Sequence, residues 1–587
     1  MTLSTTMTMY KSLKIGSLSL ALTALLATGC QNVLEQEFRS ELGPEFFATA
    51  GGLEGGVTAS YSIARFFWGS EGFTYTENAG TDESILGASD GNTTFFQYTN
   101  ILPSEGSIGS IWNNSYQAIN NLNGVLKFGP SANIDAARRT TLLAEAKFLR
   151  GFYYYLLVRN FGDVPLSLNF IDVPTTSASR APIADVYAAI IKDLTEASQE
   201  LPNTSNQSKG RATKPAALHL LAKVYLQRGW SAAAQPTDFQ MAATTARTLI
   251  DNQATYNVGL EQDFADVFRE GNEYGKESLF VIDRNTDPSY AESQFNNSPQ
   301  IANGNKENRA NFFWVSLYTN ALNVNAGIPG APNNTVAVMD RDARNGRPFR
   351  RFRPTNYTLN TAFADRTTDS RYFKTFQSAW IFNRTTPVTT SRGTLVAGRD
   401  TAIWMPGVEV TEAQRRAFKG VIISPSQYTA DLHPTMTKYT AVNRLTVNES
   451  SYRPIILFRL ADTYLLAAEA YIKDNKPAEA AAMINAVRQR AAYKTTNTPA
   501  QNAAAATALA ITPAQATLDF LLTERTRELY AEYARWQDLV RTKTLASRLA
   551  TYNPTPGFRE YHLLRPIPQS QIDLTTSGPK FPQNPGY

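Results

Sequence analysis

The chain has 587 residues, a formal net charge of +5, three histidines and a single cysteine, Cys30. One cysteine excludes an internal disulfide framework and a structural zinc site built on several thiolates. The histidines lie more than a hundred residues apart, so no pair has the spacing of a zinc-binding helix. The composition, 43% apolar and 11% aromatic, is that of a globular protein, and the charge is too small to indicate a nucleic-acid-binding protein.

Residues 1–29 have the pattern of a lipoprotein signal peptide. Lys11 and Lys14 precede an apolar stretch at 15–26, which is followed by small residues at 27–29. A membrane-spanning helix needs about 20 apolar residues, so this stretch predicts a cleaved signal instead. The sequence ATGC at 27–30 resembles a bacterial lipobox, in which the cysteine carries the lipid. We therefore expect lipid attachment at Cys30; an ordinary secretory signal with an incidental thiol is the alternative.

Helical periodicity dominates two blocks of the remaining chain, about 44–260 and 453–550. Within them, pairs of Ala-rich helices separated by short breaks are expected at 139–161 with 183–201, at 221–250 and at 467–490. Small residues followed by an aromatic are typical of tetratricopeptide-like pairs. Residues 265–450 are rich in Asn, Thr, Gly, Pro and Arg and lack this period. We predict one mainly α domain at 30–587, with tetratricopeptide-like helix pairs and a large irregular insertion of loops and short strands.

A series of short motifs makes a family resemblance specific. They are, in chain order, 144–154 (AEAKFLRGFYY), 161–166 (FGDVPL), 210–214 (GRATK), 459–464 (RLADTY), 484–488 (INAVR), 524–529 (ERTREL), 535–539 (RWQDL), 564–568 (LRPIP) and 583–587 (QNPGY). Together with Cys30 they resemble the SusD/RagB family of Bacteroidetes outer-membrane lipoproteins. The order of the motifs matches that of the family over the whole mature chain.

This resemblance implies a function and its partners. Members form an extracellular lid on a SusC-type TonB-dependent transporter, and they capture glycans, or peptides in RagB-like members, for delivery to the barrel. The implied location is the outer membrane, lipid-anchored through Cys30 and facing the cell exterior. The implied partners are the transporter, a glycan or peptide ligand and membrane lipid, without nucleic acid. A helical-repeat assembly scaffold with no small ligand is the remaining alternative.

Most of the motifs have a structural interpretation. From Leu518 onward a helical stripe is expected to run through Arg525, Glu532 and Trp536 to Leu539, so the two charged side chains must be paired if they are buried. A catalytic Glu/Arg cluster is the alternative. The FGDVPL motif predicts a helix end, because Gly162 accepts a left-handed backbone and Pro165 stops continuation.

Enzyme signals are weak. The sequence has no phosphate-binding glycine loop, and Cys30 is expected to carry lipid. We predict a protein without catalytic residues, without a cofactor and without a metal site. A glycoside hydrolase stays open, since suitable carboxylate pairs are too common to read from sequence. An irregular calcium site also stays open, although no EF-hand loop is present.

A sugar-binding protein needs exposed aromatic rings, because the C–H faces of pyranoses stack on them. Aromatic residues cluster in loop-like sequence at 66–75, 95–98 and 312–318. The predicted ligand-binding residues are Trp68, Tyr75, Tyr98, Trp314 and Tyr318. The competing interpretation is that each of these rings packs in the core.

Six arginines form a basic segment within 13 residues: Arg341, Arg344, Arg347, Arg350, Arg351 and Arg353. The plain interpretation is a solvated loop with Asp340 and Asp342 nearby. The alternatives are capture of an anionic glycan and, less compatible with an exported protein, nucleic-acid binding.

Overall fold

The structure is a computed structural model that describes residues 43–88, 91–204, 209–284, 308–326, 330–444 and 447–587. The predicted signal peptide and Cys30 lie outside these residues. Residues 47–587 form one compact unit. None of the described helices combines the length and the apolar character needed to cross a bilayer.

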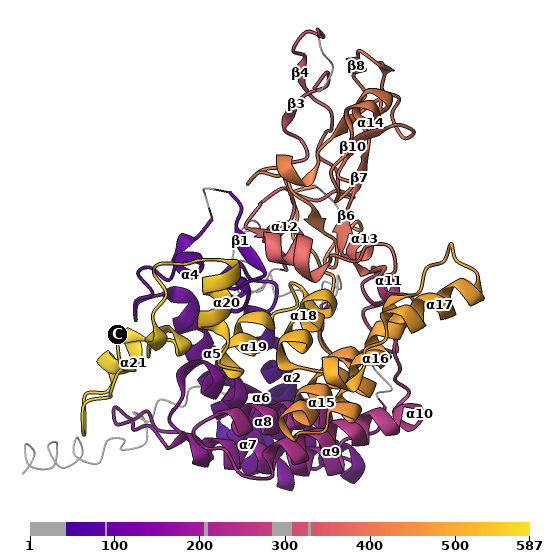
Figure 1. The fold of residues 1–587 in the computed structure, drawn as a ribbon. Coiled ribbons are helices and arrows are strands. Elements are labelled where there is room, and N and C mark those ends of the chain that lie inside the picture. Colours follow the sequence, from indigo (N-terminus) through magenta and orange to yellow (C-terminus); the bar gives the residue numbers. More distant parts are fainter. Residues whose placement is uncertain (1–42, 89–90, 205–208, 285–307, 327–329, 445–446) are drawn as a thin grey trace, which may run out of the picture. The chain divides into compact units, whose positions relative to one another are not determined.

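The N-terminal helical block is built from antiparallel pairs. Its long helices are α2 (Ala50–Ile63), α5 (Gly106–Phe128), α6 (Ala136–Phe161), α7 (Ile183–Glu200), α8 (Lys214–Trp230) and α9 (Asp238–Asp251). Each of α5 to α8 packs against its successor, as the purple and magenta ribbons of Figure 1 show. The pairs predicted at 139–201 and 221–250 are confirmed as α6 with α7 and α8 with α9. Helix α6 ends where predicted, at Gly162, whose φ of +73° is a conformation that favours glycine.

The C-terminal block packs against the N-terminal block. It contains α15 (Leu460–Lys473), α16 (Pro477–Ala491), α17 (Pro499–Leu509), α18 (Leu518–Leu529), α19 (Arg535–Arg541) and α20 (Leu545–Tyr552). Helix α15 packs against α9 from the other block and against α16, α8 and α18. Residues 460–470 of α15 are all buried as a result, and their many alanines let the neighbouring helices approach closely. The mainly α, tetratricopeptide-like fold class is therefore confirmed.

The expectation of one continuous helix from Leu518 to Leu539 is wrong. The chain leaves helical geometry between α18 and α19, where Ala531 and Tyr533 have φ of +67° and +58°. The break turns the chain, so that Trp536 and Leu539 are buried from a second, separate helix. Local periodicity did not predict the turn, because the apolar spacing continues across it.

Paired strands mark where the insertion leaves and rejoins the helical blocks. Strand β2 (Ser278–Ile282) pairs antiparallel with β13 (Ile455–Arg459), Phe280 standing opposite Phe458. Between these two strands in sequence, β3 (Ala321–Asn323) pairs with β4 (Thr335–Ala337), β6 (Phe376–Gln377) with β12 (Thr435–Met436) and β8 (Thr389–Thr390) with β9 (Gly393–Thr394), and β10 (Thr401–Trp404) lies between β7 (Ala379–Ile381) and β11 (Val421–Ile422). Strand β5 (Phe352–Pro354) of the insertion pairs with β1 (Ser84–Leu86), which comes from the N-terminal block. The predicted irregular insertion with short strands is confirmed.

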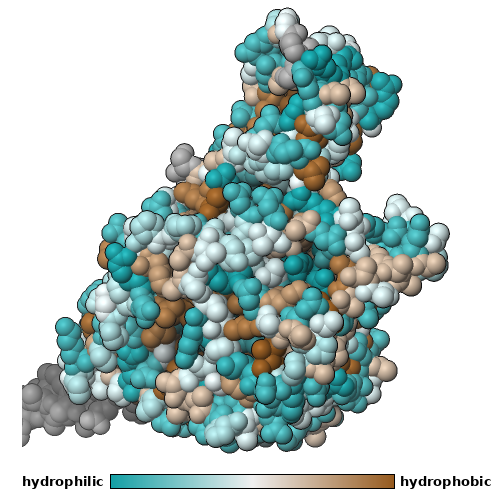
Figure 2. Space-filling model, in the orientation of Figure 1, coloured by the Kyte–Doolittle hydropathy of each residue, from teal (hydrophilic) through white to brown (hydrophobic). Residues whose placement is uncertain are grey.

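The described residues bury two main apolar clusters. The larger one joins both helical blocks, and a second, between Val315 and Leu432, is formed by insertion residues such as Trp380 and Ile403. On the face drawn in Figure 2, apolar surface is broken into small patches among hydrophilic side chains. The short helices of the insertion and its flanks are α10 (Gln253–Tyr256), α11 (Phe264–Val267), α12 (Ala310–Phe313), α13 (Arg371–Thr375) and α14 (Glu412–Ala417), and α21 (Gln569–Leu574) lies near the C-terminus.

Candidate functional site

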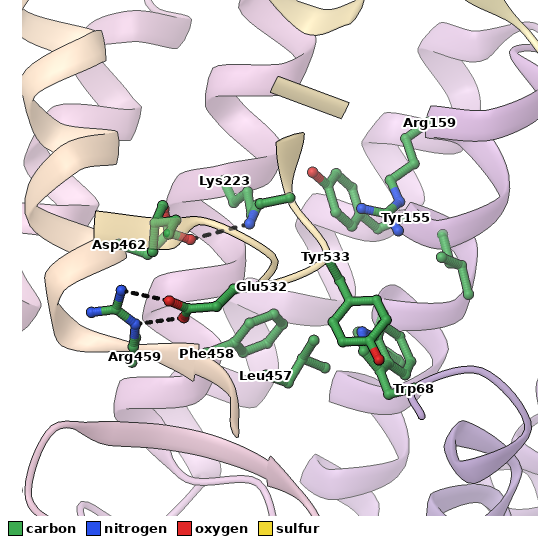
Figure 3. Close-up of a pocket in the computed structure, with 14 residues that line it drawn as sticks. Trp68, Tyr155, Arg159, Lys223, Leu457, Phe458, Arg459, Asp462, Glu532 and Tyr533 are labelled. Atoms are coloured by element: carbon green, nitrogen blue, oxygen red, sulfur yellow. Dashed lines mark hydrogen bonds and ion pairs between the residues drawn. The ribbon is translucent and has the colours of Figure 1, made fainter. Parts of the chain in front are cut away.

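A cavity lined by conspicuous charged groups lies inside the helical block. Its wall includes Trp68, Lys223, Arg459, Asp462 and Glu532, and Figure 3 shows Arg459 and Lys223 turned toward the two carboxylates. Its volume is about 40 Å³. A buried water needs roughly 10–15 Å³ of such space, and ligand pockets measure about 300–1,000 Å³. The cavity therefore has room for a few waters and none for a sugar.

The charges around this cavity neutralise one another. Arg459 donates to Glu532 at 2.7 and 3.0 Å, and Asp462 accepts from Lys223 at 3.2 Å and from Arg525 at 2.8 Å. The expectation that Arg525 and Glu532 each have a charged partner is confirmed. Burial by itself raises the pKa of Asp462, but Lys223 and Arg525 outweigh it and hold that pKa well below its usual range. A glycosidase general acid needs a raised pKa, so the geometry favours a structural role for this cluster.

The five aromatic residues predicted to bind ligand are all buried. Trp68, Tyr75, Tyr98, Trp314 and Tyr318 each expose 3% of their surface or less. The premise of an exposed ring face is wrong for all of them, because all five side chains pack into the buried apolar clusters. A direct ligand contact by these five residues stays a prediction without support from their exposure. Asn78, Asp82 and Glu83, the polar residues grouped with the first aromatic cluster, are buried as well.

Two of these rings lie in one aromatic layer. Tyr75 and Trp314 lie 5.3 and 4.9 Å from the ring of Phe352, centroid to centroid, and Phe96 lies 5.2 Å from it. This layer packs against the strand pair β1–β5. Tyr98 lies outside it, against Phe558 and His562, and donates to the carbonyl of Gly80 at 2.6 Å.

The other two rings lie elsewhere. Trp68 packs against Phe73 and Phe152 and reaches the interior cavity. Tyr318 belongs to the insertion cluster and donates to the carbonyl of Gly346 at 2.7 Å. The structure therefore does not bring the five predicted residues together at one site.

A larger pocket opens beside the strand pair, and we call it the β1–β5 pocket. It is lined by Ile85, Leu86, Phe96, Gln97, Thr99, Arg353 and residues 553–557. Its volume is about 530 Å³, within the range of small-molecule sites. Two smaller surface pockets, of about 400 and 310 Å³, lie at the start of α3 (Glu71–Asn78) and beside α16.

Three separate parts of the chain build the β1–β5 pocket. One wall is the end of α4 (Thr93–Gln97), after which Tyr98 takes a left-handed conformation with φ of +55°. The facing wall is the loop after α20, held where Asn553 donates to the carbonyl of Thr81 at 2.7 Å. The loop touches α4 through Gly557, where an added Cβ would lie 2.0 Å from the carbonyl oxygen of Gln97. Only glycine permits this approach without displacement of the backbone.

The pocket combines apolar edges with hydrogen-bonding groups. Ile85, Leu86 and Phe96 offer apolar surface, while Gln97 and Thr99 are exposed amide and hydroxyl side chains. This mixture suits a molecule with C–H faces and many hydroxyls. Within the described ranges, no group of three or more His, Cys, Asp or Glu side chains is arranged to hold a metal ion.

The basic segment does not act as one charged surface. Arg350 is ion-paired with Asp431, and Arg351 with Glu71 at 2.6 Å. Arg347 lies over the ring of Phe349, 4.7 Å from its centroid. Asp340, expected to neutralise this segment, lies 3.2 Å from Arg384 instead. Arg353 alone of the six lines the pocket.

Sequence reasoning missed most of the pocket. Gln97 and Thr99 flank the predicted Tyr98, so the aromatic cluster at 95–98 adjoins the pocket lining, although Tyr98 itself does not line the pocket. The loop at 553–557 (NPTPG) carries a turn signal in its prolines and glycine, but nothing in its sequence indicates that it faces α4.

Two family models match the chain. One, described as starch-binding associating with outer membrane, matches residues 67–226. The other, described as the SusD family, matches residues 251–587.

Similar proteins agree with these matches. A SusD-like protein (P2) of Formosa agariphila is 33% identical over 285 residues, which cover 46% of this chain and only 53% of that protein. Another from the same organism (P25) is 24% identical over 93% of this chain and 94% of its own. A solved SusD homolog from Bacteroides thetaiotaomicron has a TM-score of 0.66 at 22% identity, covering 93% and 99% of the two chains. For a laminarin-binding SusD-like protein these values are 0.62, 23%, 91% and 99%. At such identities the likeness shows the fold.

Proposed function

Because this chain belongs to the SusD family, we propose that it is a cell-surface lipoprotein that binds oligosaccharides and delivers them to a SusC-like TonB-dependent transporter. The single observation that carries ligand binding is the β1–β5 pocket, which has the volume and the mixed lining of a small-molecule site. A glycan is favoured over a peptide because structural neighbours are described as laminarin-binding and as a surface glycan-binding protein. The role is binding without catalysis.

A blocking variant tests whether ligand enters this pocket. Thr99→Trp places an indole in the opening, and we expect it to abolish binding to a glycan array by the full chain purified in detergent. Thr140→Trp is the matched control, because Thr140 is an exposed threonine on the outer surface of α6. Equal binding by both variants would place the ligand elsewhere.

The same array separates the alternatives. Binding to printed peptides alone would make this a RagB-like peptide-binding lipoprotein, and binding to neither class would favour an assembly scaffold. Incubation with the bound glycan is expected to release no product; product formation would indicate a glycoside hydrolase.

Anchoring and partnership are tested in cells. Cys30→Ser is expected to move the protein from the outer-membrane fraction to a soluble fraction, because the acyl chains provide the anchor. Protease added to intact cells is expected to degrade the native protein if it faces the exterior. An affinity-tagged full chain is expected to co-purify with a TonB-dependent barrel; its absence from mild-detergent extracts would contradict the transport role.

A further inference from the structure

Arg353 is placed in the β1–β5 pocket by strand register. It stands in β5 opposite Ile85 of β1, and both residues line the pocket. Side chains alternate between the two faces of a strand. The preceding residue, Phe352, therefore points into the aromatic layer with 0% of its surface exposed, and Arg353 points the other way.

Arg353 differs from the arginines beside it. Arg350 and Arg351 are each ion-paired with a carboxylate. The guanidinium of Arg353 has no hydrogen bond or ion pair to any described residue, and its Nε is shielded from solvent without an acceptor. Burial lowers the pKa of this guanidinium from its ordinary value. An arginine that is half-buried and unpaired loses hydration without compensation, which is a cost that a ligand anion would remove.

The surroundings leave this charge uncompensated. The described lining residues include no carboxylate, and Gln97, Thr99, Asn553 and Thr555 are neutral. His433 adds no charge, since burial first and Arg353 second lower its pKa to about 4. The pocket lining that the structure describes therefore carries a single positive charge at neutral pH.

We propose that the β1–β5 pocket selects an acidic saccharide, whose carboxylate or sulfate group pairs with the Arg353 guanidinium. The planar guanidinium donates two parallel hydrogen bonds to such an oxyanion. The edges of Ile85, Leu86 and Phe96 contact the sugar ring, and Gln97 and Thr99 reach its hydroxyls. This inference rests on the proposed saccharide binding and adds the chemical class of the ligand.

The test compares matched acidic and neutral sugars. Uronate-containing and sulfated oligosaccharides are printed beside their carboxyl-reduced or desulfated counterparts, and the full chain is applied at low and high salt. We expect the acidic member of a pair to bind at least about tenfold more tightly, as a charge-assisted hydrogen bond provides. The two acidic series distinguish a carboxylate from a sulfate ligand.

Variants assign the preference to Arg353. Arg353→Gln is expected to remove the acidic preference, and Arg353→Lys to retain part of it, which also controls for folding. Arg344→Gln, at an exposed arginine of the same segment, is the matched control and is expected to bind as the native chain does.

Each remaining outcome is decisive. If the native chain and Arg353→Gln both bind the acidic and neutral sugars equally, this inference is overturned. In that case, a Thr99→Trp variant that binds neither sugar would still support the proposed function. Failure of the native chain to bind any saccharide overturns both.

Discussion

Replacing Glu528 with glutamine tests whether buried ion pairs hold the C-terminal helical block and the insertion together. Its carboxylate is fully buried in α18 and accepts from Arg459 at 2.6 Å, from Arg371 at 2.9 Å and from Arg490. These arginines belong to β13, α13 and α16. Burial raises the pKa of Glu528, but the three guanidiniums outweigh it and lower that pKa below its ordinary value.

The expected cost follows from what glutamine leaves behind. The substitution keeps the shape of the side chain and removes its charge, so three buried guanidiniums lose their shared anion. Removing one member of a buried pair costs about 3–5 kcal/mol, and we expect the free energy of unfolding of Glu528→Gln to fall by about that amount at pH 7.

Urea unfolding followed by circular dichroism measures this loss. The control is Glu412→Gln, because Glu412 is an exposed glutamate paired with Arg416 one turn away. Such a surface pair contributes less than about 1 kcal/mol. Equal stability of the two variants would refute the argument that the Glu528 carboxylate organises these arginines.

Three further predictions concern the core and the pocket. Burial raises the pKa of Glu83 to about 7 from 4.5. The stability that protonated Glu83 contributes is therefore full below about pH 4.5 and is lost as pH rises through 7. In thermal unfolding, the melting temperature of Glu83→Gln should rise relative to that of the native chain between pH 5 and pH 8. Gly557→Ala should lose saccharide binding and about 1–3 kcal/mol of stability, because its Cβ meets the Gln97 carbonyl; native-like binding would show that the loop adjusts. Trp314→Ala, at a ring exposed by only 2%, should cost about 3–5 kcal/mol, and an unchanged melting temperature would contradict its place in the aromatic layer.

The helical pairs illustrate what local sequence predicts well. Helix α16 begins at Pro477 and is periodic and rich in alanine, so its position can be predicted from neighbouring residues in the sequence. The α18–α19 break was missed for the complementary reason. Ala531 and Tyr533 adopt positive φ because tertiary contacts hold them there, and neither residue type favours that conformation.

The arginines of the basic segment show why the candidate site was harder to predict. Arg351 and Arg353 are the same residue type two positions apart, and no local pattern distinguishes them. Arg351 is neutralised by Glu71, which lies 280 positions away in sequence, whereas Arg353 faces the pocket. The contact of Arg351 with α3 and the pairing of β5 with β1 give the two arginines different surroundings.

The sequence by itself determined the mainly α, paired-helix scaffold, the position of the irregular insertion and the resemblance that the family match confirms. Those features depend on periodicity, on breaks and on motifs read over a few residues. The tertiary structure alone decided that the predicted aromatic rings are buried and that the β1–β5 pocket joins Ile85, Leu86, Phe96, Gln97, Thr99, Arg353 and residues 553–557. Exposure and pocket shape depend on contacts between distant segments, and local sequence patterns do not predict those contacts.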